Sequence, residues 1–259
     1  FYKEIPNHQK IYYPTLINEN DKNEDTLELE YLPFPNLAEV FLFREINANR
    51  WENILHSLFK IYSAFYIDNK SYSSNASLIY SKKLESRINS LNKLVSKSKH
   101  NLLKELITKG QIINNQQFPS LNETVEKLNN YLQKYEQEIL LFFGHGDLSF
   151  NNILIEPISG CIKLIDPKAE RLFNNKVGFM DPNYDLSKLN HSFNCLYDSI
   201  VNNLFSLFSE KEGYVLKIIK PRNYEAANYY FKKIFTDKLI EEDLLRILTS
   251  NLFISMLPL

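Results

Sequence analysis

The chain has 259 residues, 44% of them hydrophobic, which is enough for one large domain or two lobes. Its 30 basic and 31 acidic side chains leave a formal net charge of -1, so nucleic acid is not an expected partner. No apolar run reaches the roughly 18 residues that span a bilayer, and no signal peptide opens the sequence. The two cysteines fit reduced thiols in a cytoplasmic protein better than a disulfide framework.

The first 35 residues are expected to form a small sheet. Strand-like patterns cover 11–17 and 26–32, with a polar turn at 18–25 between them. Prolines at 33 and 35 then end the pairing. The start at Phe1 and the stop inside an apolar run both predict a fragment, with further domains beyond its ends.

Helices are expected to dominate the rest of the chain. The apolar spacing predicts helices over 36–43 and 51–67, then two amphipathic helices over 80–95 and 121–139 whose stripes face the core. A polar loop is expected at 69–77, a helix from about Asp185, and a hairpin over 204–219. The last 35 residues are predicted to be helical, with core positions at Tyr230, Ile234, Leu239, Leu245 and Leu248.

The segment from 144 to 166 has a different pattern. It consists of a polar loop, a short apolar strand, a turn with proline and glycine, a second short strand and a carboxylate. Two strands joined by a tight turn pair with each other. Because Asn152 begins the first strand and Asp166 follows the second, the hairpin should bring both to one end. Asp147 lies in the loop that leads to that end.

These three side chains suit magnesium-dependent phosphoryl transfer. Mg²⁺ prefers oxygen ligands, and Asn152 and Asp166 can supply them. Asp147 is then available to orient an acceptor hydroxyl and to accept its proton. Phosphoryl transfer depends on positioning and charge neutralisation more than on covalent chemistry, so a site this small can suffice.

The pattern His145-x-Asp147-x-x-x-x-Asn152 has the spacing of the protein kinase catalytic loop. Together with the following Ile-Leu it resembles the aminoglycoside phosphotransferase and choline kinase superfamily. Asp166 resembles the metal-binding Asp of that family, and Asp185 resembles an Asp that supports the catalytic loop from below. The resemblance implies an α+β, protein kinase-like two-lobe fold, with a truncated N-terminal lobe and a mainly helical C-terminal lobe.

The resemblance also implies where a nucleotide binds. Residues 28–33 resemble the hinge strand, whose backbone holds the base, so Glu30 and Leu32 are the expected main-chain contacts of ATP or GTP. Residues 1–35 would then be the remnant of the N-terminal lobe with the hinge strand. Residues 36–259 would be the C-terminal lobe with the catalytic loop. A Gly-rich phosphate loop and its partner lysine would lie before Phe1.

Four other assignments carry two interpretations each. His145 is expected to hold the loop by hydrogen bonds rather than to transfer a proton. Asp185 can also cap a helix. Lys168 fits a contact to phosphate or an anionic acceptor as well as it fits a surface lysine. His191 fits a packed or solvent-facing position better than an acceptor contact.

The leading hypothesis is a small-molecule kinase that uses Mg²⁺ and ATP or GTP to phosphorylate a sugar, a sugar derivative or an amino alcohol. Residues 166–168 and 185–192 resemble phosphotransferase-like proteins of bacterial surface-polysaccharide pathways, which points to a capsule or lipopolysaccharide precursor. Aminoglycoside modification is a second hypothesis. It is disfavoured because aminoglycosides are polycations whose sites tend to be acidic, whereas the net charge of this chain is near zero. The third is a pseudokinase or nucleotide-sensing module within a larger protein. A protein kinase is disfavoured because no typical activation segment follows Asp166.

Overall fold

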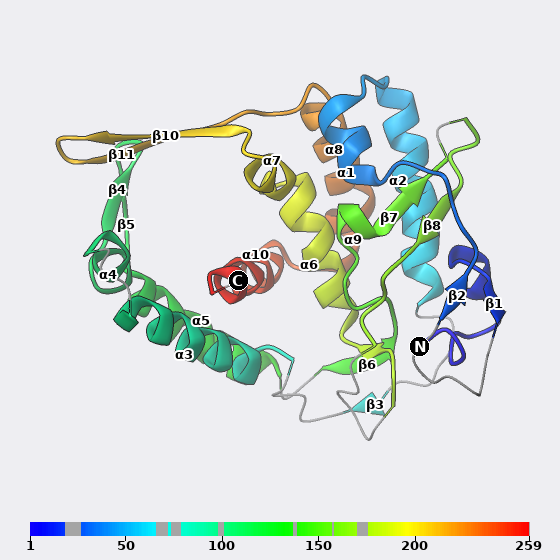
Figure 1. The fold of residues 1–259 in the computed structure, drawn as a ribbon, viewed down its shortest axis with the longest axis horizontal. Coiled ribbons are helices and arrows are strands. Elements are labelled where there is room, and N and C mark those ends of the chain that lie inside the picture. The colour runs from blue at the N-terminus through cyan, green and yellow to red at the C-terminus, as the bar shows by residue number, and fades with distance from the viewer. Residues whose placement is uncertain are drawn as a thin grey trace.

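The computed structural model describes residues 1–18, 27–65, 72–73, 79–97, 101–136, 139–156, 158–169 and 176–258. The predicted turn at 18–25 and the predicted polar loop at 69–77 lie almost entirely outside these residues. The described chain combines several small sheets with many helices (Figure 1). This is the expected α+β class.

A two-stranded sheet lies near the N-terminus (Figure 1). In it β1 (Leu16–Asn18) pairs antiparallel with β2 (Glu28–Leu29). Both strands are shorter than predicted. The first begins late because Lys10–Tyr12 forms a 3-10 turn instead of a strand. This turn leads directly into Tyr13, whose side chain is 1% exposed in the main core.

Two helices follow where they were predicted, α1 (Leu37–Phe43) and α2 (Ala48–Ala64). Asparagine caps set both starts, because Asn36 accepts a hydrogen bond from an amide of α1 and Asn47 accepts one from an amide of α2. Both helices bury apolar residues in the main core. The same core holds the strands next to the loop at 144–152.

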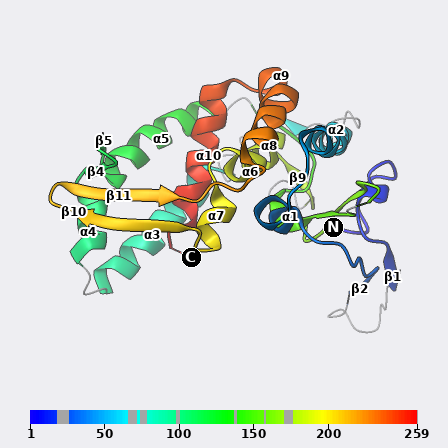
Figure 2. The ribbon, with the colours of Figure 1, turned by 90° about the horizontal axis from the view of Figure 1, so that it is seen from above.

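A second group of elements extends away from this body. It contains α3 (Ser81–Lys97), α4 (Asn101–Thr108) and α5 (Leu121–Tyr135), and a capping box between Ser120 and Glu123 starts α5. Between α4 and α5 lies a hairpin that was not predicted, β4 (Gln111–Ile113) with β5 (Gln116–Phe118). It is joined by the predicted hairpin of β10 (Phe205–Glu210) and β11 (Gly213–Ile218), in which β11 pairs parallel with β4 (Figures 1 and 2).

The remaining helices connect the two groups. They are α6 (Pro182–Phe193), α7 (Tyr197–Val201), α8 (Tyr224–Phe231), a π-helical turn (Lys232–Thr236), α9 (Asp237–Leu239) and α10 (Glu242–Met256). In this region α10 packs on α6 and α3. Four of the five predicted core residues are at least partly buried, but Leu239 is wrong, because α9 is a single turn at the surface that leaves it 39% exposed. Within the described residues, each helix is either too short or too polar to act as a transmembrane segment.

Candidate active site

The predicted hairpin after the loop is confirmed. In it β7 (Ile153–Ile155) pairs antiparallel with β8 (Ile162–Leu164), and Ile153 faces Leu164. One step further, the amide of Ile165 donates to the carbonyl of Asn152 at 2.9 Å. Asn152 and Asp166 therefore lie at the same end of the hairpin. Two short apolar strands and the intervening turn with proline and glycine were sufficient to predict this arrangement.

The backbone of Asp166 adopts an uncommon conformation. Its φ is +52°, in the left-handed region that residues other than glycine seldom occupy. Such a conformation costs on the order of 1 kcal/mol and persists only where the surroundings enforce it. Here the amides of Ile165 and Lys168, on either side of Asp166, donate to the carbonyls of Asn152 and His145. The turn that carries the carboxylate is thus held against the loop.

His145 joins the loop to this turn. Its Nδ1 accepts a hydrogen bond from the amide of Asp147, so the proton of the neutral ring is on Nε2, which donates to the carbonyl of Ile165 at 2.9 Å. The ring stacks on Tyr13, with centroids 6.2 Å apart. Burial lowers the pKa of His145 to about 4, against the opposing effect of the hydrogen bond to Ile165. A neutral ring with both nitrogens engaged fits the expected structural role.

Asp185 lies beneath the loop and binds its backbone. One carboxylate oxygen accepts from the amides of His145 and Gly146, and the other accepts from the amide of Leu148, all at 3.0–3.1 Å. Burial raises the pKa of Asp185 to about 7, while these amides act in the opposite direction. The residue that caps α6 is Asp181, which accepts from the amide of Asn183. The interpretation of Asp185 as a cap is therefore wrong, and α6 begins earlier than predicted.

Gly146 is the loop residue that admits no side chain. Its φ is +76°, and a Cβ built there would lie 2.9 Å from the Cβ of Lys168. The loop and the turn after Asp166 therefore approach each other too closely for any other residue. This contact places Asp147, the next residue, beside the turn that carries Asp166.

The amide of Asn152 is held in a defined orientation by Asp147. Its Nδ2 donates to the carbonyl of Asp147 at 2.8 Å and to Oδ2 of the same residue at 3.3 Å. A carbonyl oxygen can only accept, so this bond fixes which end of the amide is nitrogen, and Oδ1 points the other way. An amide oxygen and the Asp166 carboxylate form a donor set of the kind that Mg²⁺ prefers. The residues present thus fit the ion.

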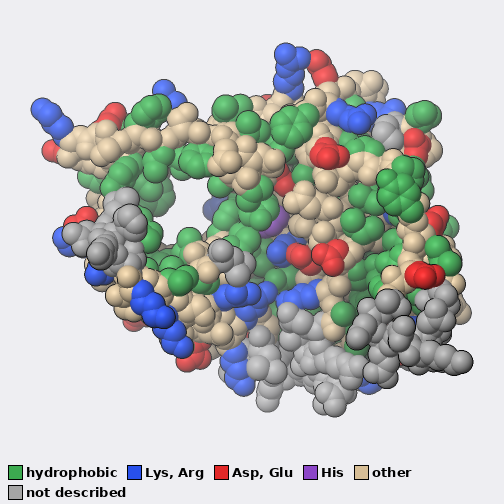
Figure 3. Space-filling view, viewed as in Figure 1, with side chains coloured by type: hydrophobic (Ala, Val, Ile, Leu, Met, Phe, Trp, Pro, Cys, Tyr) green, Lys and Arg blue, Asp and Glu red, His purple; other side chains and the backbone are tan. Residues whose placement is uncertain are grey.

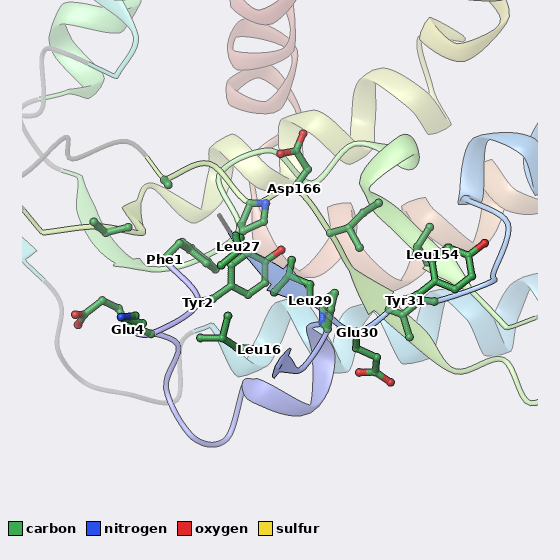
Figure 4. A pocket seen from close by; sticks show the side chains of 17 residues that line it. Phe1, Tyr2, Glu4, Leu16, Leu27, Leu29, Glu30, Tyr31, Leu154 and Asp166 are labelled. Carbon is green, nitrogen blue, oxygen red and sulfur yellow. The ribbon is translucent and has the colours of Figure 1, made fainter. Parts of the chain in front are cut away.

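A pocket of about 910 Å³ leads to Asp166. Its walls come from the N-terminal residues, from β1, β2 and the segment that follows, and from the hairpin; the lining residues include Tyr2, Leu16, Leu29, Glu30, Leu32, Leu154 and Asp166. Figure 4 shows apolar side chains along the pocket, with Phe1 and Glu4 toward one end, Leu154 and Tyr31 toward the other, and Asp166 at the edge between them. The volume and the apolar walls suit a flat aromatic ring, and the Asp166 carboxylate lies at their edge.

The hinge-like segment borders this pocket through Glu30 and Leu32. The amide of Glu30 donates to the carbonyl of Thr15, and the Glu30 carboxylate accepts from the amide and hydroxyl of Thr15 at 3.0 Å. Glu30 therefore ties the segment to β1, and its carboxylate points away from the pocket (Figure 4). Among the hydrogen bonds between described residues, none uses the amide of Leu32.

Comparison with solved structures identifies the architecture. The chain is similar to a glucosamine kinase in complex with glucosamine, ADP and inorganic phosphate, with a TM-score of 0.53 and 12% identity over 96% of this chain and 60% of that one. The chain has a protein kinase-like fold. An aminoglycoside-3'-phosphotransferase of type VIII gives a TM-score of 0.49 and 14% identity, over 95% of this chain and 74% of that one. No family model matches the sequence, and no curated protein matches it.

Within this kinase-like fold, Lys188 is a site residue that the sequence analysis missed. Its Nζ lies 2.8 Å from Oδ1 of Asp147, and its side chain is only 14% exposed. Burial of Asp147 raises the pKa of its carboxyl, but Lys188, together with the smaller effects of His145 and Lys168, holds the pKa below its usual value. Lys188 stands three residues after Asp185 on α6, so both face the loop. That spacing was a readable signal.

We expect Lys188→Met to lower kcat/KM and to move the acid limb of the pH–rate profile to higher pH. Without the ammonium, burial of Asp147 is opposed only by the weaker effects of His145 and Lys168, so the pKa of Asp147 rises and less of the carboxylate is ionised on the acid side. A pH profile of phosphate transfer measures this shift. Lys188→Arg, which keeps the charge, should largely restore the profile. An unmoved acid limb in Lys188→Met would contradict the role of the ion pair.

Lys168 and His191 are the two remaining candidates from the sequence. Lys168 follows the Asp166 turn, and its charge also lowers the pKa of Asp147. His191 lies on α6, is 1% exposed and stacks on Tyr197 with centroids 4.2 Å apart. Burial lowers the pKa of His191 to about 3, with a further contribution from the charge of Lys188. This placement favours packing for His191, and its acceptor contact stays a prediction.

Proposed function

We propose that the protein is a small-molecule kinase that transfers the γ-phosphate of ATP or GTP to a hydroxyl of a sugar-like acceptor. The observation that carries the proposal is the position of Asp147, Asn152 and Asp166 around one loop, with Asp166 in the lining of an apolar pocket. Glucosamine kinase, which has the same fold, is a kinase of an amino sugar by its name. That likeness supports a sugar or sugar derivative as the acceptor.

In this proposal the nucleotide base lies between the apolar walls near Leu29 and Leu154 and contacts the backbone at Glu30 and Leu32. Asn152 and Asp166 would hold Mg²⁺, which supplies charge neutralisation for the phosphates when bound. Asp147 orients the acceptor hydroxyl and accepts its proton as the oxygen attacks the γ-phosphorus, while the bond from that phosphorus to the β-phosphate oxygen breaks and ADP or GDP leaves.

The arrangement around Asp147 fits a base that stays ionised. Lys188 contacts one of its oxygens and the Asn152 amide approaches the other, so the carboxylate is fixed in orientation. Each oxygen has a second lone pair that can accept the proton of a hydroxyl. His145 and Asp185 act through the backbone of the loop rather than on the substrate.

The finer parts of the proposal rest on the sequence. We propose residues 1–35, with β1, β2 and the hinge, as part of the N-terminal lobe, and residues 36–259 as the C-terminal lobe, in a cytoplasmic protein. A surface-polysaccharide precursor is the proposed source of the acceptor, supported by the sequence at 166–168 and 185–192. The alternative is a nucleotide-sensing module without transfer activity. A module that only binds nucleotide does not need a base, so the presence of Asp147 disfavours it.

Calorimetric titration with ATP and GTP, with and without Mg²⁺, tests the proposal. Asp166→Ala should weaken binding of the magnesium–nucleotide complex by at least about tenfold, because it removes a charged ligand, while metal-free binding changes little. Glu4→Ala is a matched control, since Glu4 also lines the pocket. The assigned metal site would be contradicted if nucleotide binding did not depend on Mg²⁺ and if Asp166→Ala bound the nucleotide as tightly as Glu4→Ala. Phosphate transfer to sugars then separates a kinase from a sensing module.

A further inference from the structure

Three lysine side chains converge on the ring of Tyr184 beside Asp147. Lys83 comes from α3, Lys168 follows the Asp166 turn, and Lys188 lies on α6. Their Nζ atoms lie 5.0, 5.5 and 5.9 Å from the centre of the ring, and Lys83 also donates to the Tyr184 hydroxyl at 2.8 Å. We name Lys83, Lys168 and Lys188 the Tyr184 lysine group.

The Tyr184 lysine group is built on fixed parts of the fold. Tyr184 is buried and packs against Tyr80 from the segment before α3, with ring centroids 6.0 Å apart. The amide of Lys168 donates to the carbonyl of His145, in the catalytic loop. Cation–π attraction to one ring partly offsets the mutual repulsion of the ammonium groups. The positions of these cations are therefore set by α3, α6 and the loop together.

The Tyr184 lysine group does not line the proposed nucleotide pocket. Pro167 and Ala169 line that pocket, but Lys168 between them does not, and neither do Lys83 and Lys188. The group meets the site instead at Asp147, 2.8 Å from Lys188. Figure 3 shows Lys and Arg side chains next to Asp and Glu side chains in the middle of this face, beside a hollow.

We propose that the Tyr184 lysine group binds a carboxylate or phosphate substituent of the acceptor and thereby places the acceptor hydroxyl at Asp147. The inference rests on the proposed function, because it assigns the acceptor class of the same reaction. Lys188 is paired with Asp147, and the ammonium groups of Lys83 and Lys168 lie on the same Tyr184 ring, an arrangement that favours an anion over a cation. A lysine ammonium binds phosphate or carboxylate as a point charge with three donors. A polycationic aminoglycoside is accordingly a poor acceptor.

A matched set of hexoses tests this. Calorimetry on the full chain, with a non-hydrolysable magnesium–ATP analogue bound, compares glucose, glucosamine, glucuronate and glucose 6-phosphate. At least one of the two anionic sugars should bind about tenfold or more tightly than glucose, and glucosamine should bind more weakly. Glucuronate and glucose 6-phosphate separate a carboxylate from a phosphate as the recognised group.

Variants on α3 show whether the Tyr184 lysine group causes the preference for an anionic sugar. Lys83→Met should reduce the preference for the anionic sugar about tenfold, whereas Lys83→Arg should retain it. Lys82→Met is the matched control, since it removes the same charge from the adjacent, exposed position on α3. Thermal melting of each variant verifies that Lys83→Met still folds, and Lys168→Met provides a second removal from another segment.

Two outcomes would overturn the inference. One is glucose or glucosamine binding at least as tightly as both anionic sugars, including the case in which neither anionic sugar binds. The other is an anion preference that survives both Lys83→Met and Lys168→Met. Phosphate transfer measured in parallel separates this from the proposed function: transfer to glucose without anion preference keeps the kinase and discards the anion site. If anionic sugars bind but neither magnesium–ATP binding nor phosphate transfer is detected, the anion site stands and the proposed kinase activity is wrong.

Discussion

Asp147→Asn should lower kcat for phosphate transfer by about 10²- to 10⁴-fold while the affinity for the magnesium–nucleotide complex changes little. The substitution removes the group that accepts the hydroxyl proton but leaves Asn152 and Asp166 in place. It also removes a negative charge beside Lys188, so the acceptor KM can change through that ammonium. The loss should nevertheless appear mainly in kcat, because the proton moves as the new bond forms.

The measurement is the steady-state rate with the best acceptor of the hexose set, together with calorimetric titration of the nucleotide. Asp243→Asn is a suitable control, because Asp243 is an exposed carboxylate on α10, far along the chain from the loop. Thermal melting guards against a folding defect, since the asparagine must fit between Lys188 and the Asn152 amide. If Asp147→Asn turns over within a few-fold of the unaltered protein, Asp147 is not the base.

The catalytic hairpin was predictable because its determinants are local. Two short apolar strands and a turn with glycine set the pairing of β7 with β8, and this pairing brings Asn152 and Asp166 to the same end of the hairpin. The asparagine caps of α1 and α2 are equally local signals. The spacing of the motif then predicted that Asp147, Asn152 and Asp166 belong to one site.

The parts that the sequence analysis missed depend on contacts between distant segments. The hairpin of β4 and β5 has a polar second strand, Gln116–Phe118, and is joined to β11 by a single parallel pairing across about a hundred residues. The Tyr184 lysine group arises from three segments whose lysines look like ordinary surface residues one at a time. Leu239 fits a helical apolar pattern, but α9 ends before that pattern can face the core.

Asp185, which binds the loop backbone from below, is expected to have a large effect on stability. Asp185→Ala should lower the free energy of unfolding by roughly 3–5 kcal/mol, because it leaves the amides of His145, Gly146 and Leu148 without their acceptor in a buried position. Asp185→Asn should recover only part of this, since its amide nitrogen would face backbone donors.

Hydrogen exchange locates the damage that Asp185→Ala causes. The three loop amides should lose protection together, whereas the amides that pair β7 with β8 should keep theirs, because the hairpin does not depend on this carboxylate. Ser187→Ala is the matched control on α6: Ser187 is also buried, but its hydroxyl bonds only the carbonyl of Asn183 within the helix. Unchanged protection of the loop amides in Asp185→Ala would show that the loop holds its shape without Asp185. In that case the position of Asp147 would have to be set by Lys188, His145 and the close approach at Gly146 instead.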